Sequence, residues 1–271
     1  MRVIRSILLA LGVAGSVAAQ TEYAARVTVN SGNSFVVKKL NIKGDRLYTE
    51  NGQSSSSLSM VSNIEFRFMG VSLPLCEKMF HTGDRKSLEG LLEQYVMPVA
   101  QYSYLPTNLG GYLEWLLRAQ YWNRSFAGAG KTIGLLRQTG VQGHIDVASF
   151  YFTLMLLDQG KVGDAKEVFS SIADPASVSK AGTEFIEGKF ALEEGRPRQA
   201  MQHVARIIAF HARDQEWMAP ATVLEARIYQ RLGQQEKAAL VANELMIAYP
   251  GSQWSERGEQ IKKESTGNAG G

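Results

Sequence analysis

Apolar and polar residues alternate along residues 23–68, which is the period of strands that bury one face. Turn residues such as Lys43-Gly44-Asp45 separate the alternating runs. The expected strands cover 26–29, 34–37, 46–49 and 63–68, with a flexible polar tip at 54–57 and room for another short strand at 58–61. Short strands joined by tight turns favour a small antiparallel, barrel-like β module, which we assign to residues 20–70.

After Phe68 the period changes to that of amphipathic helices. Residues 71–109 are expected to hold a connector, 71–86, and a first helix, 87–102, in which Pro98 introduces a kink. Residues 110–264 show almost no strand pattern, so we expect an α+β chain by segments, with an all-α array behind the β module. Residues 265–271 are expected to be a loose tail.

The helical region repeats itself at an interval of 35 to 38 residues. A small residue lies near the start of every second helix, and these residues are Ala129, Ala165, Ala200 and Ala238. A glycine stands five residues before three of them, at Gly160, Gly195 and Gly233. Such a glycine suits the left-handed cap that ends a helix, and the alanine lets the next helix approach closely. The spacing predicts about four helix pairs.

This pattern resembles the tetratricopeptide repeat, which pairs two antiparallel helices with a period of about 34 residues. The last copy carries the resemblance through Ala226, Tyr229, Gly233, Ala238 and Pro250. Earlier copies keep fewer of the family's residues: Gly188, Gly195 and Ala200 in one, Gly160, Ala165 and Phe169 in another, and Ala129 in the first, where Arg124 stands at the turn glycine. The resemblance implies a superhelix over residues 110–264, and a generic array of helical hairpins is the alternative.

The β module is similar in outline to the small Sm-like or SH3-like barrels at the front of some exported bacterial proteins. The similarity rests on Gly44-Asp45, Asn51-Gly52 and the closing run Ile64-Glu65-Phe66. The segment Ala248-Tyr249-Pro250-Gly251-Ser252 is similar to the end of a repeat in periplasmic tetratricopeptide proteins. Both resemblances imply a protein of the cell envelope.

The first 19 residues have the pattern of a secretory signal peptide. Arg2 and Arg5 precede an apolar stretch at 7–13, and Val17-Ala18-Ala19 places small residues before a cleavage point. An uncleaved membrane anchor is the alternative, but the stretch is shorter than the roughly 20 residues that a bilayer requires. We therefore expect cleavage near Ala19, export to the periplasm or beyond, and no transmembrane segment.

The charges of the chain nearly cancel, with 29 basic and 26 acidic residues, or 27 against 26 once Arg2 and Arg5 are set aside. Nucleic-acid binders usually have a strong basic excess or a dense basic stripe, so we expect no nucleic-acid partner. Cys76 is the only cysteine. We expect it to be a buried apolar residue, with an intermolecular disulfide as the alternative.

Motifs for catalysis, cofactors and metals are incomplete. Residues 125–132 nearly match a phosphate-binding loop, but Ser125 stands where the motif needs glycine, and a predicted helix rather than a strand precedes it. His203 and His211 are eight residues apart, two helical turns, and no third ligand is offered. We therefore expect no catalytic residue, no cofactor, no metal and no enzymatic activity.

In tetratricopeptide arrays the first helix of each pair lines a concave groove. The residues that the resemblance places there are Glu114, Arg118, Tyr121, Phe150, Leu154, Phe185, Lys189, Arg227 and Gln230. Three of them, Arg118, Lys189 and Arg227, occupy the same position in their copies. Cations beside aromatic rings suit an extended peptide with acidic groups. Ordinary exposed helix positions are the alternative interpretation.

These features together predict an exported, non-catalytic scaffold or adaptor that binds a protein or peptide partner, with acidic peptides favoured. A binder of a small ligand or glycan in the cleft between the β module and the helical array is the alternative. A degenerate enzyme built on residues 125–132 is a third.

Overall fold

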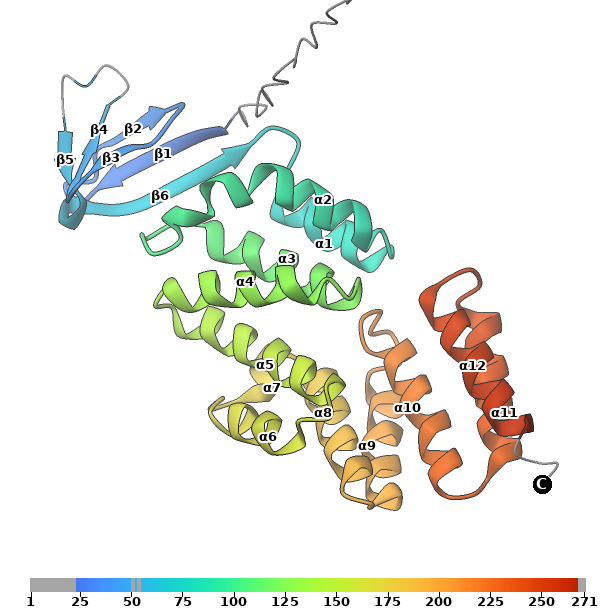
Figure 1. Ribbon diagram of the computed structural model, residues 1–271. Coiled ribbons are helices and arrows are strands. Elements are labelled where there is room, and N and C mark those ends of the chain that lie inside the picture. Colours follow the sequence, from blue (N-terminus) through green and yellow to red (C-terminus); the bar gives the residue numbers. More distant parts are fainter. Residues whose placement is uncertain (1–22, 50–51, 53–54, 268–271) are drawn as a thin grey trace, which may run out of the picture.

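A computed structural model describes residues 23–49, 52 and 55–267. Most of this chain is helical, with a small antiparallel sheet region at its N-terminal end, which confirms the α+β arrangement by segments. The helices follow the sheets as a curved array (Figure 1). Within the described residues no helix is both long and apolar enough to cross a membrane. The predicted signal peptide lies outside them.

The β module consists of two three-stranded antiparallel sheets, in the orders β2-β1-β6 and β3-β4-β5. A closed barrel is not seen in the part of the chain that is described. The strands are β1 Tyr23–Val29, β2 Ser34–Val37, β3 Asn41–Lys43, β4 Arg46–Tyr48, β5 Ser55–Ser57 and β6 Val61–Phe68. The four predicted strands are present as β1, β2, β4 and β6, and β3 is a strand that was not predicted.

The predicted polar tip and the further short strand are wrong in detail. Residues 55–57 form β5, because they pair with β4 and the Arg46 Nε atom donates a hydrogen bond to the Ser55 hydroxyl at 2.8 Å. This pairing overrides the low strand propensity of a serine run. Residues 58–60 then form the 3-10 helix η1 Leu58–Met60, and β6 begins directly after it.

β6 fixes the β module to the helices. The Asn108 side chain, just before α3 Leu109–Trp122, accepts a hydrogen bond from the Phe66 amide at 2.8 Å and donates one to the Phe66 carbonyl at 2.9 Å. The Phe66 ring also stacks on Tyr102, with 6.3 Å between centroids. The β module is therefore packed onto the array.

The connector expected at 71–86 contains a helix, α1 Leu73–His81. Ser72 caps it by accepting a hydrogen bond from the Leu75 amide at 3.4 Å, and Pro74 suits the first turn. The helix has only nine residues, of which two are buried, so its period is too weak to show in the sequence.

The helix expected at 87–102 is also shorter, since α2 covers Arg85–Tyr95 and the 3-10 helix η2 Met97–Tyr102 follows. Pro98 lies in the first turn of η2. A proline has no amide for the α-helical hydrogen bond and disfavours the helical conformation of the residue before it. Pro98 therefore accompanies the end of the helix and does not kink it.

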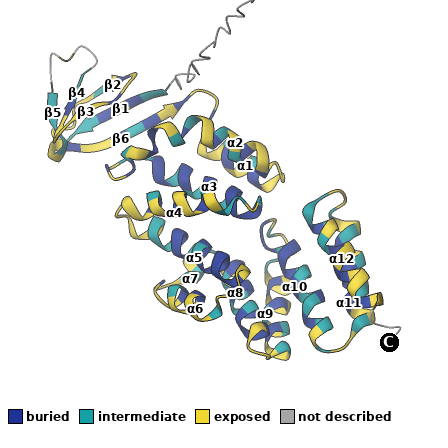
Figure 2. Ribbon diagram, in the orientation of Figure 1, coloured by how far each residue is buried: buried dark blue, intermediate teal, exposed yellow. Residues whose placement is uncertain are grey.

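The remaining helices form packed pairs, with buried residues on the sides that face each other (Figure 2). The first pair is α3 with α4 Phe126–Gln138, the second α5 Gln142–Asp158 with α6 Val162–Ser170, the third α8 Lys180–Glu193 with α9 Pro197–Phe210, and the fourth α10 Met218–Arg231 with α11 Gln235–Ala248. A single turn, α7 Pro175–Val178, precedes α8. The repeating alanines are fully buried, as their spacing predicts.

The loose tail was predicted to begin at residue 265, but the chain is still helical there. The helix α12 covers Gln253–Gly267 and packs on α10 and α11. Ser265 is buried, and its hydroxyl accepts a hydrogen bond from the Gln230 side chain at 3.0 Å. Gly258 permits the close approach of α12, since a Cβ there would lie 2.8 Å from the carbonyl oxygen of Ala242 on α11. Residues 268–271 lie outside the described chain.

The turn inside each helix pair has the same hydrogen bonds in all four copies. The cap residue donates its amide to the carbonyl three residues earlier, and the next amide donates to the carbonyl five residues before it. Gly160, Gly195 and Gly233 are caps with φ of 73°. Arg124 is the cap of the first pair, with φ of 64°, and it is the only non-glycine residue with positive φ in the described chain.

Replacing Gly195 by alanine is expected to lower the free energy of unfolding by about 1 kcal/mol, because an L-residue is strained in this conformation. A Cβ there meets nothing within 4 Å, so no packing changes. The matched control is Gly134→Ala in the exposed middle of α4, which should raise the free energy of unfolding by about 0.5–1 kcal/mol. Chemical denaturation measures both, and changes of the same sign would contradict the left-handed cap.

Candidate functional site

The loop between α9 and α10, residues 211–217, is folded between α3, α5 and α8. Asp214 shapes it, since its Oδ1 atom accepts hydrogen bonds from the amides of Glu216 at 2.9 Å and Trp217 at 3.1 Å. The Trp217 indole is almost fully buried. Gly182 on α8 makes room for the indole, because a Cβ there would lie 2.7 Å from its Cζ2 atom.

Glu216 lies at the centre of this packing and is 3 % exposed. Its carboxylate accepts hydrogen bonds from Arg118 Nη1 and Trp122 Nε1, both at 2.9 Å, and from the Tyr151 hydroxyl. Arg118 and Trp122 belong to α3 and Tyr151 to α5. The carboxylate therefore joins the loop to two helices, and we call these four residues the Glu216 hub.

The surroundings of the Glu216 hub keep Arg118 charged and Tyr151 protonated. Burial acts to lower the pKa of Arg118, but the interactions with Tyr151, Glu216 and Glu114 raise it overall. Burial is also the main cause that raises the pKa of Tyr151, so its hydroxyl keeps the proton that it donates. Arg118 stays charged and forms a buried ion pair with Glu216.

Arg85 on α2 places a second buried cation beside the hub. Its guanidinium lies 4.6 Å from the ring centroid of Phe80 and 5.5 Å from that of Trp122. Its Nη2 atom donates a hydrogen bond to the Gln215 carbonyl at 3.4 Å. Burial lowers the pKa of Arg85, and Glu216 acts in the opposite direction. Arg85 thereby attaches α2 to the same loop.

The last helix returns to the end of α3. The Gln253 side chain at the start of α12 donates a hydrogen bond to the Trp122 carbonyl at 3.1 Å. The Trp254 ring meets the Trp122 ring edge-on, with 5.5 Å between centroids. The start of α12 therefore lies next to the Glu216 hub, although 131 residues separate Gln253 from Trp122.

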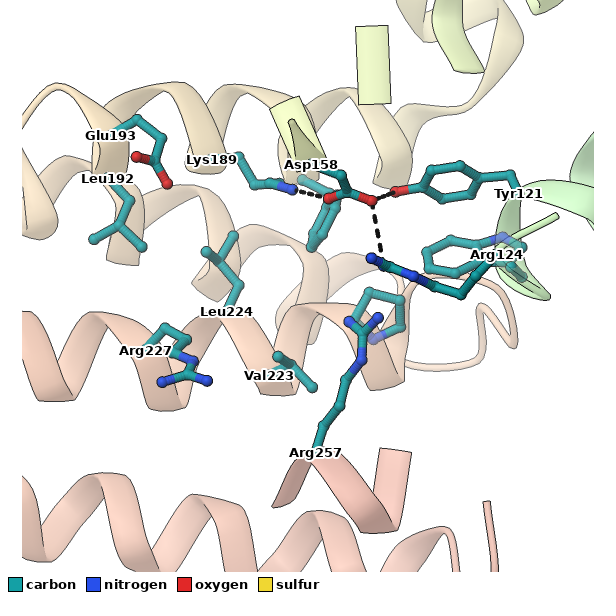
Figure 3. A pocket seen from close by; sticks show the side chains of 13 residues that line it. Tyr121, Arg124, Asp158, Lys189, Leu192, Glu193, Val223, Leu224, Arg227 and Arg257 are labelled. Atoms are coloured by element: carbon teal, nitrogen blue, oxygen red, sulfur yellow. Dashed lines mark hydrogen bonds and ion pairs between the residues drawn. The ribbon is translucent and has the colours of Figure 1, made fainter. Parts of the chain in front are cut away.

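A cavity of about 170 Å³ lies beside the hub, between α3, α5, α8, α10 and α12 (Figure 3). We call it the basic pocket. Its apolar walls include Phe185, Pro220, Val223 and Leu224. Its charged residues are Arg124, Lys189, Arg227 and Arg257, with the acids Asp158 and Glu193.

Asp158 balances much of the charge on one side of the basic pocket. One carboxylate oxygen accepts a hydrogen bond from Lys189 Nζ at 2.7 Å. The other accepts a hydrogen bond from the Tyr121 hydroxyl at 3.1 Å and lies 3.5 Å from Arg124 Nη1 (Figure 3). Burial first, and Asp158 second, raise the pKa of Tyr121, so the phenol remains a donor.

The opposite side carries two arginines in different situations. Arg227 forms an ion pair with Glu264 of α12 and donates a hydrogen bond to the Gln230 side chain at 2.9 Å. Arg257 lies 5.2 Å from the Trp254 ring centroid. It makes no hydrogen bond or ion pair with any residue that the structure describes. Burial, and then Arg124, lower the pKa of Arg257, whereas Asp158 acts to raise it.

Two open depressions share walls with the basic pocket. One, of about 640 Å³, shares Glu193 and Arg227, among others, and is also lined by Gln230. The other, of about 1330 Å³, shares Trp122, Arg124 and Arg257 and runs along the hub's loop. The three spaces share wall residues and therefore lie next to one another, and we call them together the track.

The basic pocket brings together some of the residues predicted for the groove, namely Tyr121, Phe185, Lys189 and Arg227. The others lie elsewhere. Arg118 belongs to the hub, Phe150 and Leu154 are fully buried in the core, and Gln230 lines the adjoining depression. Glu114 is paired with His144 at 2.6 Å. The three predicted groove cations each already have an acidic partner within the chain.

Four important residues of this region are absent from the sequence prediction: Arg124, Asp158, Glu216 and Arg257. Arg124 has a visible signal, because it stands where the other copies have a turn glycine. Glu216 lies in a loop and Arg257 in the helix after the last pair, so neither has a position in the repeat. Only the folded chain brings them together.

The near match to a phosphate-binding loop is part of a helix. Residues 126–138 form α4, and α3 precedes it. Thr132 is fully buried, and its hydroxyl donates a hydrogen bond to the Gln120 side chain at 2.8 Å. A Cβ at Gly128 would lie 2.7 Å from Gln120 Nε2, so this glycine serves helix packing.

Other candidate chemical groups have structural partners. His144 pairs with Glu114 and His203 with Glu184. Among the described residues no three His, Cys, Asp or Glu side chains are grouped to hold a metal ion. Cys76 is buried, and burial raises the pKa of its thiol to about 11.

Comparison with protein-family models, curated proteins and solved structures found no match to this chain.

The Glu216→Ala substitution is expected to lower the free energy of unfolding by about 3–5 kcal/mol, because it leaves the largely buried cation of Arg118 without its acid. The control is Glu65→Gln, which breaks an exposed pair with Arg67 and should change little. Chemical denaturation of both variants provides the comparison. Equal effects would show that the Glu216 hub contributes no more than a surface pair.

Proposed function

We propose that this chain is an exported, non-catalytic adaptor of the cell envelope that binds a protein or peptide partner through a tetratricopeptide-type array. Export rests on the signal-peptide pattern of residues 1–19. The repeat assignment is supported by four helix pairs with equivalent caps and buried alanines. The β module would be the small barrel-like unit in front of this array.

The shape of the track is the main support for the proposed binding role. A small-molecule site is usually an enclosed pocket that covers most of its ligand. Here an open depression adjoins the basic pocket on each side. Such a shape accommodates an extended chain that places one residue in the pocket and its neighbours in the flanking depressions.

The chemistry of the walls indicates the kind of chain. Phe185, Val223 and Leu224 offer apolar contact, and four cations surround them. A segment that combines acidic and apolar residues fits both features. The partner in this proposal is therefore an extended, acidic peptide segment.

Selection from a random peptide library with the purified chain is expected to yield sequences rich in Asp, Glu and aliphatic residues. Val223→Glu places an acid inside the basic pocket and should weaken the selected peptides at least tenfold, because like charges then meet. Leu240→Glu on the exposed side of α11 is the matched control and should leave binding unchanged. Isothermal titration calorimetry measures both, and equal loss in the two variants would place the peptide outside the track.

A further inference from the structure

Arg124 adopts a conformation that the rest of the array reserves for glycine. Its φ is 64°, and the equivalent caps are Gly160, Gly195 and Gly233. A left-handed conformation strains any residue with a Cβ. Strain of this kind persists where the surroundings impose it, and it concentrates at functional sites. The position therefore requires an explanation that an ordinary helix cap does not provide.

The contacts of Arg124 within the chain are weak. The ion pair with Asp158 is 3.5 Å long, and the Arg124 side chain is 50 % exposed. Asp158 has closer partners in Lys189 and Tyr121. The guanidinium also lies 4.9 Å from the Phe126 ring centroid, which is a modest attraction at an exposed position. Contacts of this strength do not offset the strain of an arginine at a position that favours glycine.

Arg257 faces Arg124 across the basic pocket (Figure 3). It lies against the Trp254 ring and makes no ion pair or hydrogen bond with any of the described residues. Both arginines line the basic pocket and the larger depression, so they lie where the two spaces meet. Burial, and then the positive charge of Arg124, lower the pKa of Arg257, and an anion between the two guanidinium groups would counter the effect of Arg124.

We propose that Arg124 and Arg257 form a carboxylate-binding pair at this junction of the track. The inference rests on the proposed peptide-binding function and names the group that the peptide must carry. Guanidinium groups bind carboxylates through parallel N–H donors, and two of them can enclose one carboxylate.

The local charge favours an anionic group. The four cations of the basic pocket outnumber its two acids, Asp158 and Glu193. The excess of positive charge attracts a carboxylate of the peptide. Val223 and Leu224 on α10 provide the apolar surface for the aliphatic part of an acidic residue or of a chain end.

Three octapeptide probes test the proposal and identify the source of the carboxylate. The first alternates leucine and glutamate with both ends blocked, the second has glutamine in place of glutamate, and the third is the glutamine peptide with a free carboxyl end. The full chain should bind the first or the third at least tenfold more tightly than the second, as calorimetry measures. The better of the two shows whether a side chain or a chain end supplies the group.

Arg124→Ala, Arg124→Gly and Arg257→Gln should each reduce the affinity for the carboxylate peptide about tenfold and leave the blocked glutamine peptide unchanged. The two Arg124 variants lose the same guanidinium, but glycine accepts the left-handed conformation. The glycine variant should therefore melt about 2–4 °C above the alanine variant while it binds no better. Arg198→Ala, at an exposed position of α9, is the matched control and should change neither property.

Equal binding of the three probes to the unmodified chain, or no binding of any of them, would overturn the carboxylate site. A tenfold preference that survives in the Arg124 and Arg257 variants would overturn the assignment to this pair. If these variants bind normally while Val223→Glu does not, the proposed function stands and the carboxylate pair fails. If Val223→Glu also binds library peptides normally, the proposed function fails as well.

Discussion

The buried carboxylate of Glu216 is the interaction on which the inner side of the helical array depends. A charge removed from water is tolerated only where donors surround it, and here Arg118, Trp122 and Tyr151 supply them. Glu216 and Arg118 are 98 residues apart, so this contact joins the first helix pair to the loop before the last. The loop fills part of the space that an array of helix pairs would otherwise leave open. The track lies beside this loop.

The geometry of the basic pocket follows from the same hub. Trp122 donates its indole N–H to Glu216, and its carbonyl accepts a hydrogen bond from Gln253 on α12. Its ring contacts Trp254, and Trp254 in turn supports the guanidinium of Arg257. A continuous set of contacts therefore connects the buried carboxylate to the cation that faces the pocket. Displacement of the loop would move the start of α12 and with it one wall of the site.

The sequence predicted the features that depend on local interactions. Helix periodicity and the glycine caps at Gly160, Gly195 and Gly233 are encoded within a few turns of chain, and the structure has them where they were expected. The helix α1 was not predicted, because its nine residues are too few to show a clear helical period. The strand β5 was not predicted, because it forms by pairing with β4 and its own residues have low strand propensity. The Glu216 hub could not be predicted, since its members have no common spacing.

The predicted groove residues show that the position of a cation in a repeat does not determine whether it is free to bind a ligand. Equivalent places in a repeat put Arg118, Lys189 and Arg227 on corresponding helix faces, and the period alone predicts that. Whether such a cation can bind a ligand depends on the acids that neighbouring elements bring near it, and each of these three has one.

Two cations of the basic pocket lie where the repeat is interrupted. Arg124 replaces a cap glycine, and Arg257 belongs to the helix that follows the last pair. Regular positions in an array are under the same packing demands in every copy, so their charges tend to be matched by their neighbours. Where the pattern is broken the partners are weaker: Arg124 shares Asp158 with Lys189 and Tyr121, and Arg257 makes no ion pair with any described residue. In the basic pocket, the cations with the weakest acidic partners are therefore the two that depart from the repeat.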